Sequence, residues 1–157
     1  MKKALLLIFI LTWAIIIFTF SNSDTDKSNN LSKSFGETII NITNNLHITN
    51  IKEEAKSEVI ILINKPIRKI AHMFEYFVLS LLIFNFSKIL KIGKKKYCLT
   101  IGVCFIYSIL DEFHQTFIRG RTGQLSDCLI DMTGVLIYTL LVYLVTKKRR
   151  NKEYEKI

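Results

Sequence analysis

Residues 4–20 read ALLLIFILTWAIIIFTF, a run of seventeen residues without a charged side chain. A helix needs about 20 mostly apolar residues, and no fewer than about 17, to cross the hydrocarbon core of a bilayer. Three further apolar stretches follow, at about 67–90, 97–118 and 125–145. A membrane barrel needs many alternating segments of roughly 10 residues, for which the chain has no room. The sequence therefore predicts an all-α integral membrane protein, a four-transmembrane-helix bundle that forms a single domain over residues 1–157.

The first stretch also has features of a signal peptide. Two lysines precede its apolar core, and small residues follow it at Ser21 and Ser23. The core is longer than the usual apolar region of such a peptide, and Phe18 and Phe20 fit a cleavage site poorly. A span is the favoured interpretation, and the signal peptide remains the alternative; the predicted topology of the rest is the same in both cases.

The positions of the basic residues explain how a chain that is 50% hydrophobic carries a net charge of +9. Thirteen of the 22 lysines and arginines lie before the first stretch, in or next to the connector between the second and third, or after the fourth. They are Lys2, Lys3, Lys88, Lys91, Lys94, Lys95, Lys96, Lys147, Lys148, Arg149, Arg150, Lys152 and Lys156. Short basic segments stay in the cytoplasm. Both termini are therefore predicted to be cytoplasmic in a multi-pass protein, and nucleic-acid binding is not needed to explain the charge.

The segment 21–65 has a nearly balanced charge and is predicted to lie outside the membrane on the extracytoplasmic side. It holds five lysines against six acids, which are Asp24, Asp26, Glu37, Glu53, Glu54 and Glu58. Part of it is predicted to be helical, because apolar residues recur at helical spacing at Leu31, Phe35, Ile39, Ile42 and Leu46. Such a stripe would either lie in the membrane interface or pack over the outer ends of the spans. Pro66 is expected in the first turn of the second spanning helix.

Ionisable side chains inside the predicted spans are the most informative residues for function. Each costs about 2.5–3.5 kcal/mol at the centre of the membrane, so such residues usually mark a pathway or a site. The second stretch carries Arg68, Lys69, His72, Glu75 and Tyr76; the third carries Asp111, Glu112 and Gln115; the fourth carries Asp127 and Asp131; and Arg121 lies in the loop between the last two. With the alternating topology, Glu75, Asp111 and Asp131 lie roughly 8–13 Å below the outer ends of their helices. They are therefore expected to converge in the outer half of the membrane.

The same residues carry a resemblance to a known family. The stretches RKIAHMFEYFVLSLL (68–82) and DEFHQTFIRGRTGQLSDCLIDMTG (111–134) resemble the VanZ-like family of bacterial membrane proteins. The matching positions are Lys69, His72, Tyr76, Asp111, Glu112, Gln115, Phe117, Gly120, Arg121, Asp127, Asp131 and Gly134. The chain departs from the family pattern at Arg119, where proline is usual, and at Asp131, where many members have asparagine. The resemblance implies a cell-envelope protein in a bacterial membrane, linked to glycopeptide resistance of the teicoplanin type.

Four interpretations of the polar residues stay open. The favoured one is a ligand-binding site in the outer leaflet that handles a lipid-linked cell-wall precursor or a lipoglycopeptide, without a cofactor. A second is a membrane enzyme acting on a lipid-linked phosphate or sugar, with His72, Glu112 and Asp111 as candidate acid and base residues. A third is a divalent metal held by His72 and carboxylates, although no helix signature of a metal site is present. The fourth is structural pairing that fastens the bundle.

Overall fold

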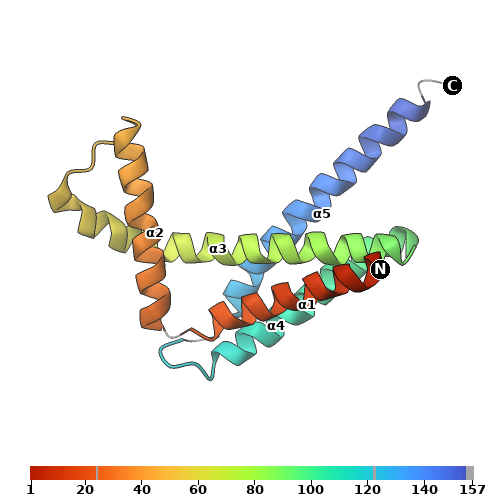
Figure 1. The fold of residues 1–157 in the computed structure, drawn as a ribbon, viewed down its shortest axis with the longest axis horizontal. Coiled ribbons are helices and arrows are strands. Elements are labelled where there is room, and N and C mark those ends of the chain that lie inside the picture. The colour runs from red at the N-terminus through yellow and green to blue at the C-terminus, as the bar shows by residue number, and fades with distance from the viewer. Residues whose placement is uncertain (24, 122, 155–157) are drawn as a thin grey trace.

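Five α-helices and a short 3-10 turn form the described part of the chain, which the computed structural model gives as residues 1–23, 25–121 and 123–154 (Figure 1). In chain order they are α1 (Lys2–Ser21), α2 (Thr25–Asn45), α3 (Glu53–Ile89), η1 (Gly93–Lys95), α4 (Lys96–Gln115) and α5 (Leu125–Tyr154). The predicted all-helical class is confirmed. Asp24 and Lys156, both counted in the charge pattern, lie outside the described residues.

Three of the helices in the described ranges are long and apolar enough to cross a membrane. They are α1, α3 and residues Leu125–Lys152 of α5. Only 11% of the apolar window of α1 is buried, so nearly all of its side chains are free to face lipid. Helix α4 is not among the three, because Asp111 and Glu112 in its C-terminal part make its composition less apolar. The chain thus has several candidate spans.

Helix α3 begins earlier than the sequence indicated, and the placement of Pro66 in the first turn of a helix is wrong. The helix starts at Glu53 and continues through Pro66 to Ile89. Proline removes one backbone hydrogen bond from a helix interior. Two features support the turns before it: Glu53 and Glu54 interact favourably with the positive end of the helix dipole, and α2 packs against this part of α3. The partly helical character of segment 21–65 is confirmed.

Helix α2 runs across α3 rather than along it (Figure 1). It buries Ser32, Gly36 and Ile40, and a Cβ added at Gly36 would lie 3.2 Å from the Ile63 side chain. The predicted apolar stripe lies on the other side of α2, where Leu31 and Phe35 are 61% and 63% exposed. The stripe therefore does not pack over the ends of the spans within the described chain.

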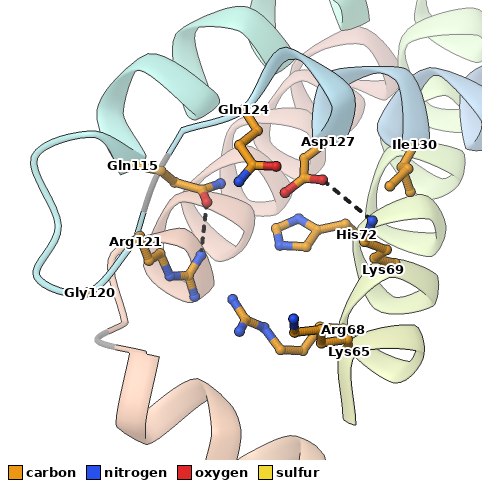
Figure 2. A pocket seen from close by; sticks show the side chains of 10 residues that line it. All are labelled: Lys65, Arg68, Lys69, His72, Gln115, Gly120, Arg121, Gln124, Asp127 and Ile130. Carbon is orange, nitrogen blue, oxygen red and sulfur yellow. Dashed lines mark hydrogen bonds and ion pairs between the residues drawn. The ribbon is translucent and has the colours of Figure 1, made fainter. Parts of the chain in front are cut away.

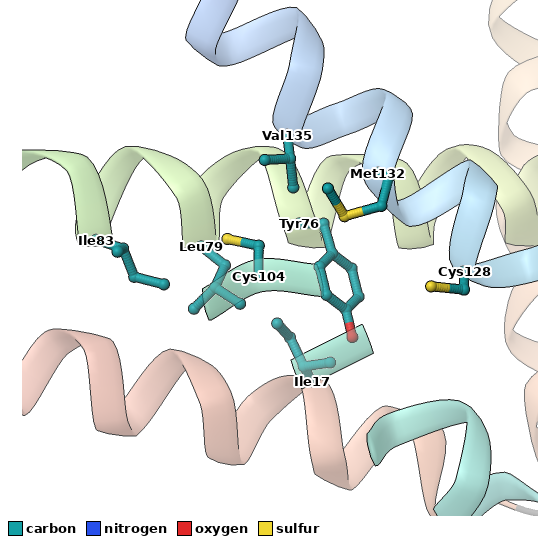
Figure 3. Packing of buried hydrophobic residues seen from close by; sticks show 8 residues of the cluster. All are labelled: Ile17, Tyr76, Leu79, Ile83, Cys104, Cys128, Met132 and Val135. Carbon is teal, nitrogen blue, oxygen red and sulfur yellow. The ribbon is translucent and has the colours of Figure 1, made fainter. Parts of the chain in front are cut away.

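The core lies where α1, α3, α4 and α5 meet, as Figure 3 shows. It consists of Ile17, Tyr76, Leu79, Ile83, Cys104, Cys128, Met132 and Val135. Two side-chain hydrogen bonds also tie α1 to the bundle: Trp13 Nε1 donates to the Glu75 carbonyl at 2.9 Å, and the Tyr107 hydroxyl donates to the Ala14 carbonyl at 2.7 Å. Helix α1 is thus an integral part of the packed structure.

Gly134 lets α5 approach α3 closely. A Cβ at this position would lie 2.0 Å from the Met73 carbonyl oxygen. Small residues allow helix backbones in membranes to come together in this way. The contact brings the polar residues of α5 next to those of α3.

The described basic clusters lie toward one end of the molecule. Figure 1 shows the N-terminus beside the turn that joins α3 and α4, with the C-terminal part of α5 running out toward the same end. The loop between α4 and α5 lies at the opposite end, next to the start of α2. The polar residues singled out in the sequence gather near this second end.

Candidate functional site

A cavity of about 440 Å³ opens between α3, the end of α4 and the start of α5 (Figure 2). Four of its ten described lining residues are lysines or arginines. The lining residues are Lys65, Arg68, Lys69, His72, Gln115, Gly120, Arg121, Gln124, Asp127 and Ile130. Asp127 is the one acid among the lining residues that the structure describes.

Helical spacing accounts for the α3 wall of the cavity. Lys65, Arg68, Lys69 and His72 occupy positions i, i+3, i+4 and i+7, which share one face of a helix. Figure 2 shows the His72 ring pointing into the cavity, with Arg68 and Arg121 on one side of it and Asp127 on the other.

His72 lies between two carboxylates from different helices. Its Nδ1 is 3.5 Å from Glu75 Oε2, one turn along α3, and 4.0 Å from Asp131 Oδ1 on α5. Asp131 is 1% exposed, and its other oxygen accepts a hydrogen bond from Ser108 Oγ at 2.7 Å. The two acids thus lie behind the imidazole at ion-pair distance, and Nδ1 forms no hydrogen bond with any described residue. The rest of the ring faces the cavity.

Gln115 connects the acids of α4 to the cavity. Its Nε2 donates to Asp111 Oδ2 at 3.1 Å and to Glu112 Oε1 at 3.2 Å. Asp111 also accepts from Ser21 Oγ at 2.7 Å, which joins the end of α1 to α4. The Gln115 Oε1 atom accepts from Arg121 Nη1 at 3.2 Å. Both acids are buried, so they hold Gln115 and its partners in place from beneath.

The loop between α4 and α5 is fitted closely to the end of α4. The Gln124 backbone N–H donates to Glu112 Oε2 at 2.9 Å. A Cβ at Gly123 would lie 2.2 Å from the Glu112 carbonyl oxygen, and Gly120 has a φ of +77°. These are positions that glycine fills without strain. Glu112 therefore sets the path of the loop that carries Arg121.

Arg121 is 9% exposed, yet its hydrogen-bond partners are neutral. Besides Gln115, it donates from Nη2 to the Phe20 carbonyl at 3.2 Å. Burial first, and next the positive charge of Arg68, lower the pKa of the Arg121 guanidinium, while Asp111 and Glu112 act in the opposite direction. An anion in the cavity would offset both unfavourable effects.

The cations at the mouth of the cavity are weakly compensated. Lys69 Nζ lies 3.8 Å from Asp127 Oδ1, but both side chains are substantially exposed, so this pair adds little stability. Arg68 donates to the neutral Asn29 Oδ1 at 3.4 Å. The side chains of residues 24–27 and 153–157 lie outside what the structure describes. Among the side chains that it does describe, neither Arg68 nor Arg121 forms an ion pair with a carboxylate.

The structure brings together six of the predicted site residues as cavity lining. These are Arg68, Lys69, His72, Gln115, Arg121 and Asp127. Glu75, Asp111, Glu112 and Asp131 lie behind that lining and are linked to it through the contacts above. Tyr76 is fully buried in the apolar core and does not line the cavity. That these residues bind a ligand stays a prediction.

Sequence reasoning missed several residues of the site. Lys65 and Gln124 line the cavity, and Ser21 and Ser108 donate to the buried acids. Lys65 lies three residues before Arg68, so helical spacing would have found it had the helix been extended through Pro66. Ser108 lies one turn before Asp111. No signal in the sequence pairs Ser21 with Asp111, because the two are 90 positions apart.

The site has groups suited to anion binding and to proton transfer. Arginine and lysine hold phosphate or carboxylate groups, and His72 with Glu75 and Asp131 has the make-up of an acid–base centre. Within the described residues, no group of three or more His, Cys, Asp or Glu side chains is placed to hold a metal ion.

A family model described as VanZ/LLP1 matches residues 6–146 of the chain. Comparison with curated proteins and with solved structures finds no significant match. Because the family model covers most of the chain, the resemblance found in the motifs is confirmed: the chain belongs to the VanZ/LLP1 family.

Proposed function

We propose that this VanZ/LLP1 membrane protein uses its cationic cavity to bind an anionic cell-envelope ligand at the outer leaflet, without covalent chemistry. The ligand is a lipid-linked cell-wall precursor or a lipoglycopeptide, and its binding or shielding underlies glycopeptide resistance of the teicoplanin type. The family match establishes a membrane protein of the VanZ/LLP1 type. The ligand and the role in resistance are what the proposal adds.

The observation that carries the proposal is the charge of the cavity. Among the side chains that the structure describes, Arg68 and Arg121 donate to an asparagine, a glutamine and a backbone carbonyl rather than to carboxylates. If the polar residues served purely to fasten the bundle, these arginines would be paired with acids, as buried membrane charges nearly always are. Their positive charge is instead available to a phosphate or carboxylate group.

The proposal includes a topology of four spans with both ends in the cytoplasm. Helix α4 has 20 residues, enough to cross a bilayer, and its acids are buried against other helices rather than facing lipid. The clustering of basic residues at one end of the molecule supports a cytoplasmic location for that end. Helix α1 is retained as the first span, in keeping with its contacts in the core. The cavity then opens at the outer face.

Two arginines of the chain provide a matched test of the function. Arg68 lines the cavity, whereas Arg119 is exposed in the loop and is not part of the lining. Teicoplanin susceptibility is measured in cells that express the wild type, Arg68→Gln or Arg119→Gln at equal membrane levels. We expect the wild type and Arg119→Gln to raise the inhibitory concentration equally and Arg68→Gln to lose most of the gain. Equal behaviour of the two variants would contradict the proposal.

A membrane enzyme acting on a lipid-linked phosphate or sugar is the second candidate. The observation in its favour is His72, which faces the cavity and has carboxylates 3.5 Å and 4.0 Å from Nδ1. Mass spectrometry of extracted lipid precursors, with and without the protein, separates the two candidates. Unchanged precursors support binding; a modified precursor that disappears in His72→Ala supports catalysis.

Glu112→Ala separates a binding role from a structural one. Glu112 accepts from Gln115 and from the Gln124 backbone, so its loss is expected to displace the loop that carries Arg121. We expect lower resistance per molecule of membrane-inserted protein. If both Glu112→Ala and His72→Ala express poorly but keep full function per molecule, the polar cluster is structural and the site assignment is wrong.

A further inference from the structure

A second groove, of about 770 Å³, lies between α4 and the diverging C-terminal part of α5, at the end of the molecule opposite the cavity. Its lining includes Lys94 and Lys96 from the start of α4 and the turn before it, and Lys147 and Arg150 from α5. The function proposed above does not use these residues.

The charge of this groove is of one sign. The described residues that line it include four cations and no acid. Among the side chains that the structure describes, none of these four cations forms an ion pair. Lys96 Nζ instead lies over the ring of Phe84, 5.2 Å from its centroid, and over that of Tyr97 at 5.7 Å. These contacts hold the ammonium group at the edge of the groove while leaving it able to bind an anion.

The other wall of the groove is apolar. It is formed by Ile101 on α4 and by Leu136 and Leu140 on α5, deeper toward the middle of the bundle. Tyr97 and Tyr143 lie between the cations and this wall, with ring centroids 6.4 Å apart. Tyrosine is typical of the boundary between headgroups and hydrocarbon. The groove thus changes from cationic to aromatic to apolar along its length.

We infer that this groove binds one acidic glycerophospholipid of the inner leaflet, with the headgroup phosphate among the four cations and an acyl chain along the apolar wall. The leaflet assignment rests on the topology proposed above; the chemistry of the groove does not. Basic pockets between spanning helices on the cytoplasmic side bind acidic lipid headgroups in this way. A free phosphate would use the cations but not the apolar wall.

Adjacent residues of α5 provide matched variants for the test. Lys147→Gln/Arg150→Gln removes two cations from the groove, whereas Lys148→Gln/Arg149→Gln removes two cations from the same exposed stretch that do not line it. The purified proteins are titrated in detergent with phosphatidylglycerol or phosphatidylcholine, and bound lipid is measured by native mass spectrometry. Circular dichroism checks that each variant keeps its helix content.

The wild type is expected to retain one phosphatidylglycerol in preference to phosphatidylcholine. Each basic residue near an acidic lipid contributes roughly fivefold in affinity, so the groove variant should bind about 20- to 30-fold more weakly. The control variant should stay close to the wild type. Equal losses in the two variants, or no preference for phosphatidylglycerol in the wild type, would overturn the assignment.

Two further arms test the apolar wall. Leu140→Trp puts a larger side chain on the apolar wall and keeps every charge. It narrows the space for an acyl chain, so it should lower phosphatidylglycerol binding. Glycerol phosphate, which has no acyl chain, should not compete with the lipid at equal concentration. If glycerol phosphate competes as well as the intact lipid, or if Leu140→Trp binds normally, the occupant is a soluble phosphate rather than a lipid.

Discussion

Asp131 is the residue at which the charge of the site can be changed with least disturbance. It is 1% exposed, accepts from Ser108 and lies 4.0 Å from His72. An asparagine has a carbonyl oxygen in nearly the same place, so it can accept the same hydrogen bond. The two acids behind His72 are thus not equivalent: Glu75 is next to it on the same helix, whereas Asp131 also fixes α4 to α5.

Asp131→Asn is expected to keep the stability of the protein within about 1 kcal/mol, whereas Asp131→Leu should lower it by about 1–3 kcal/mol because the buried Ser108 hydroxyl loses its acceptor. Thermal unfolding of the purified variants in detergent measures the difference. If Asp131→Asn is as damaging as Asp131→Leu, the negative charge rather than the hydrogen bond holds the two helices together.

At the scale of residues, the sequence predicts which side chains belong to the site better than it predicts which side chains they contact. Helical spacing places Arg68 and His72 on one face, and the structure has both in the lining. The same spacing also placed Tyr76 on this face, and there the prediction is wrong. A step of four residues is slightly more than one helical turn, so each step rotates the side chain further around the helix. Two such steps from Arg68 bring Tyr76 to the apolar core. Contacts such as Ser21 with Asp111 depend on how four helices pack, and no local pattern contains that information.

At the scale of elements, the close contact of α3 with α5 positions the acids of α5 beside His72. Gly134 makes this contact possible, since its missing side chain leaves room for the Met73 carbonyl. Gly102 on α4 is the matched control, because a Cβ there would meet nothing within 4 Å. The two glycines are both helical and differ in what surrounds them.

Gly134→Ala is expected to destabilise the protein by about 1–3 kcal/mol, because the added methyl group forces α5 away from α3. Gly102→Ala should be neutral or stabilising by up to about 1 kcal/mol, since alanine favours helix over glycine. Unfolding temperatures in the same detergent test both. A neutral Gly134→Ala would mean that the two helices are not in close contact.

Where a helix begins, and which of its sides is buried, could not be predicted from sequence patterns. Apolar runs predict the spans, but α3 extends well before its apolar run, through Pro66, because α2 packs against its first turns. Helix α2 was expected from its spacing, yet the spacing left open which side would be buried. The structure buries the side with Ser32, Gly36 and Ile40 and exposes the more apolar one.

At the scale of the whole molecule, the exposed stripe of α2 and its direction across α3 fit a helix lying in the outer membrane interface. The polar cavity is then near the outer surface and the basic clusters are near the inner one. This arrangement follows from the proposed topology, which places α2 and the tail of α5 on opposite sides of the membrane.

Accessible cysteines test the topology. Lys33→Cys lies at an exposed position of α2, Lys148→Cys lies at an exposed position of α5, and the native Cys98 is exposed at the start of α4. With Cys98 replaced by serine in both variants, a membrane-impermeant thiol reagent added to intact cells should label Lys33→Cys. Lys148→Cys, and Cys98 in the wild type, should react only after permeabilisation. Labelling of Lys148→Cys in intact cells would reverse the proposed orientation of the cavity.

The most direct test of the central claim is a binding measurement on the purified protein in phosphatidylcholine nanodiscs. A polyprenyl pyrophosphate-linked cell-wall precursor and teicoplanin are titrated in parallel against the wild type, Arg68→Gln and Arg119→Gln. We predict saturable binding of at least one of the two, weakened about tenfold or more in Arg68→Gln by the loss of a charged hydrogen bond and unchanged in Arg119→Gln. The claim is contradicted if neither ligand binds the wild type, or if Arg68→Gln binds as tightly as Arg119→Gln.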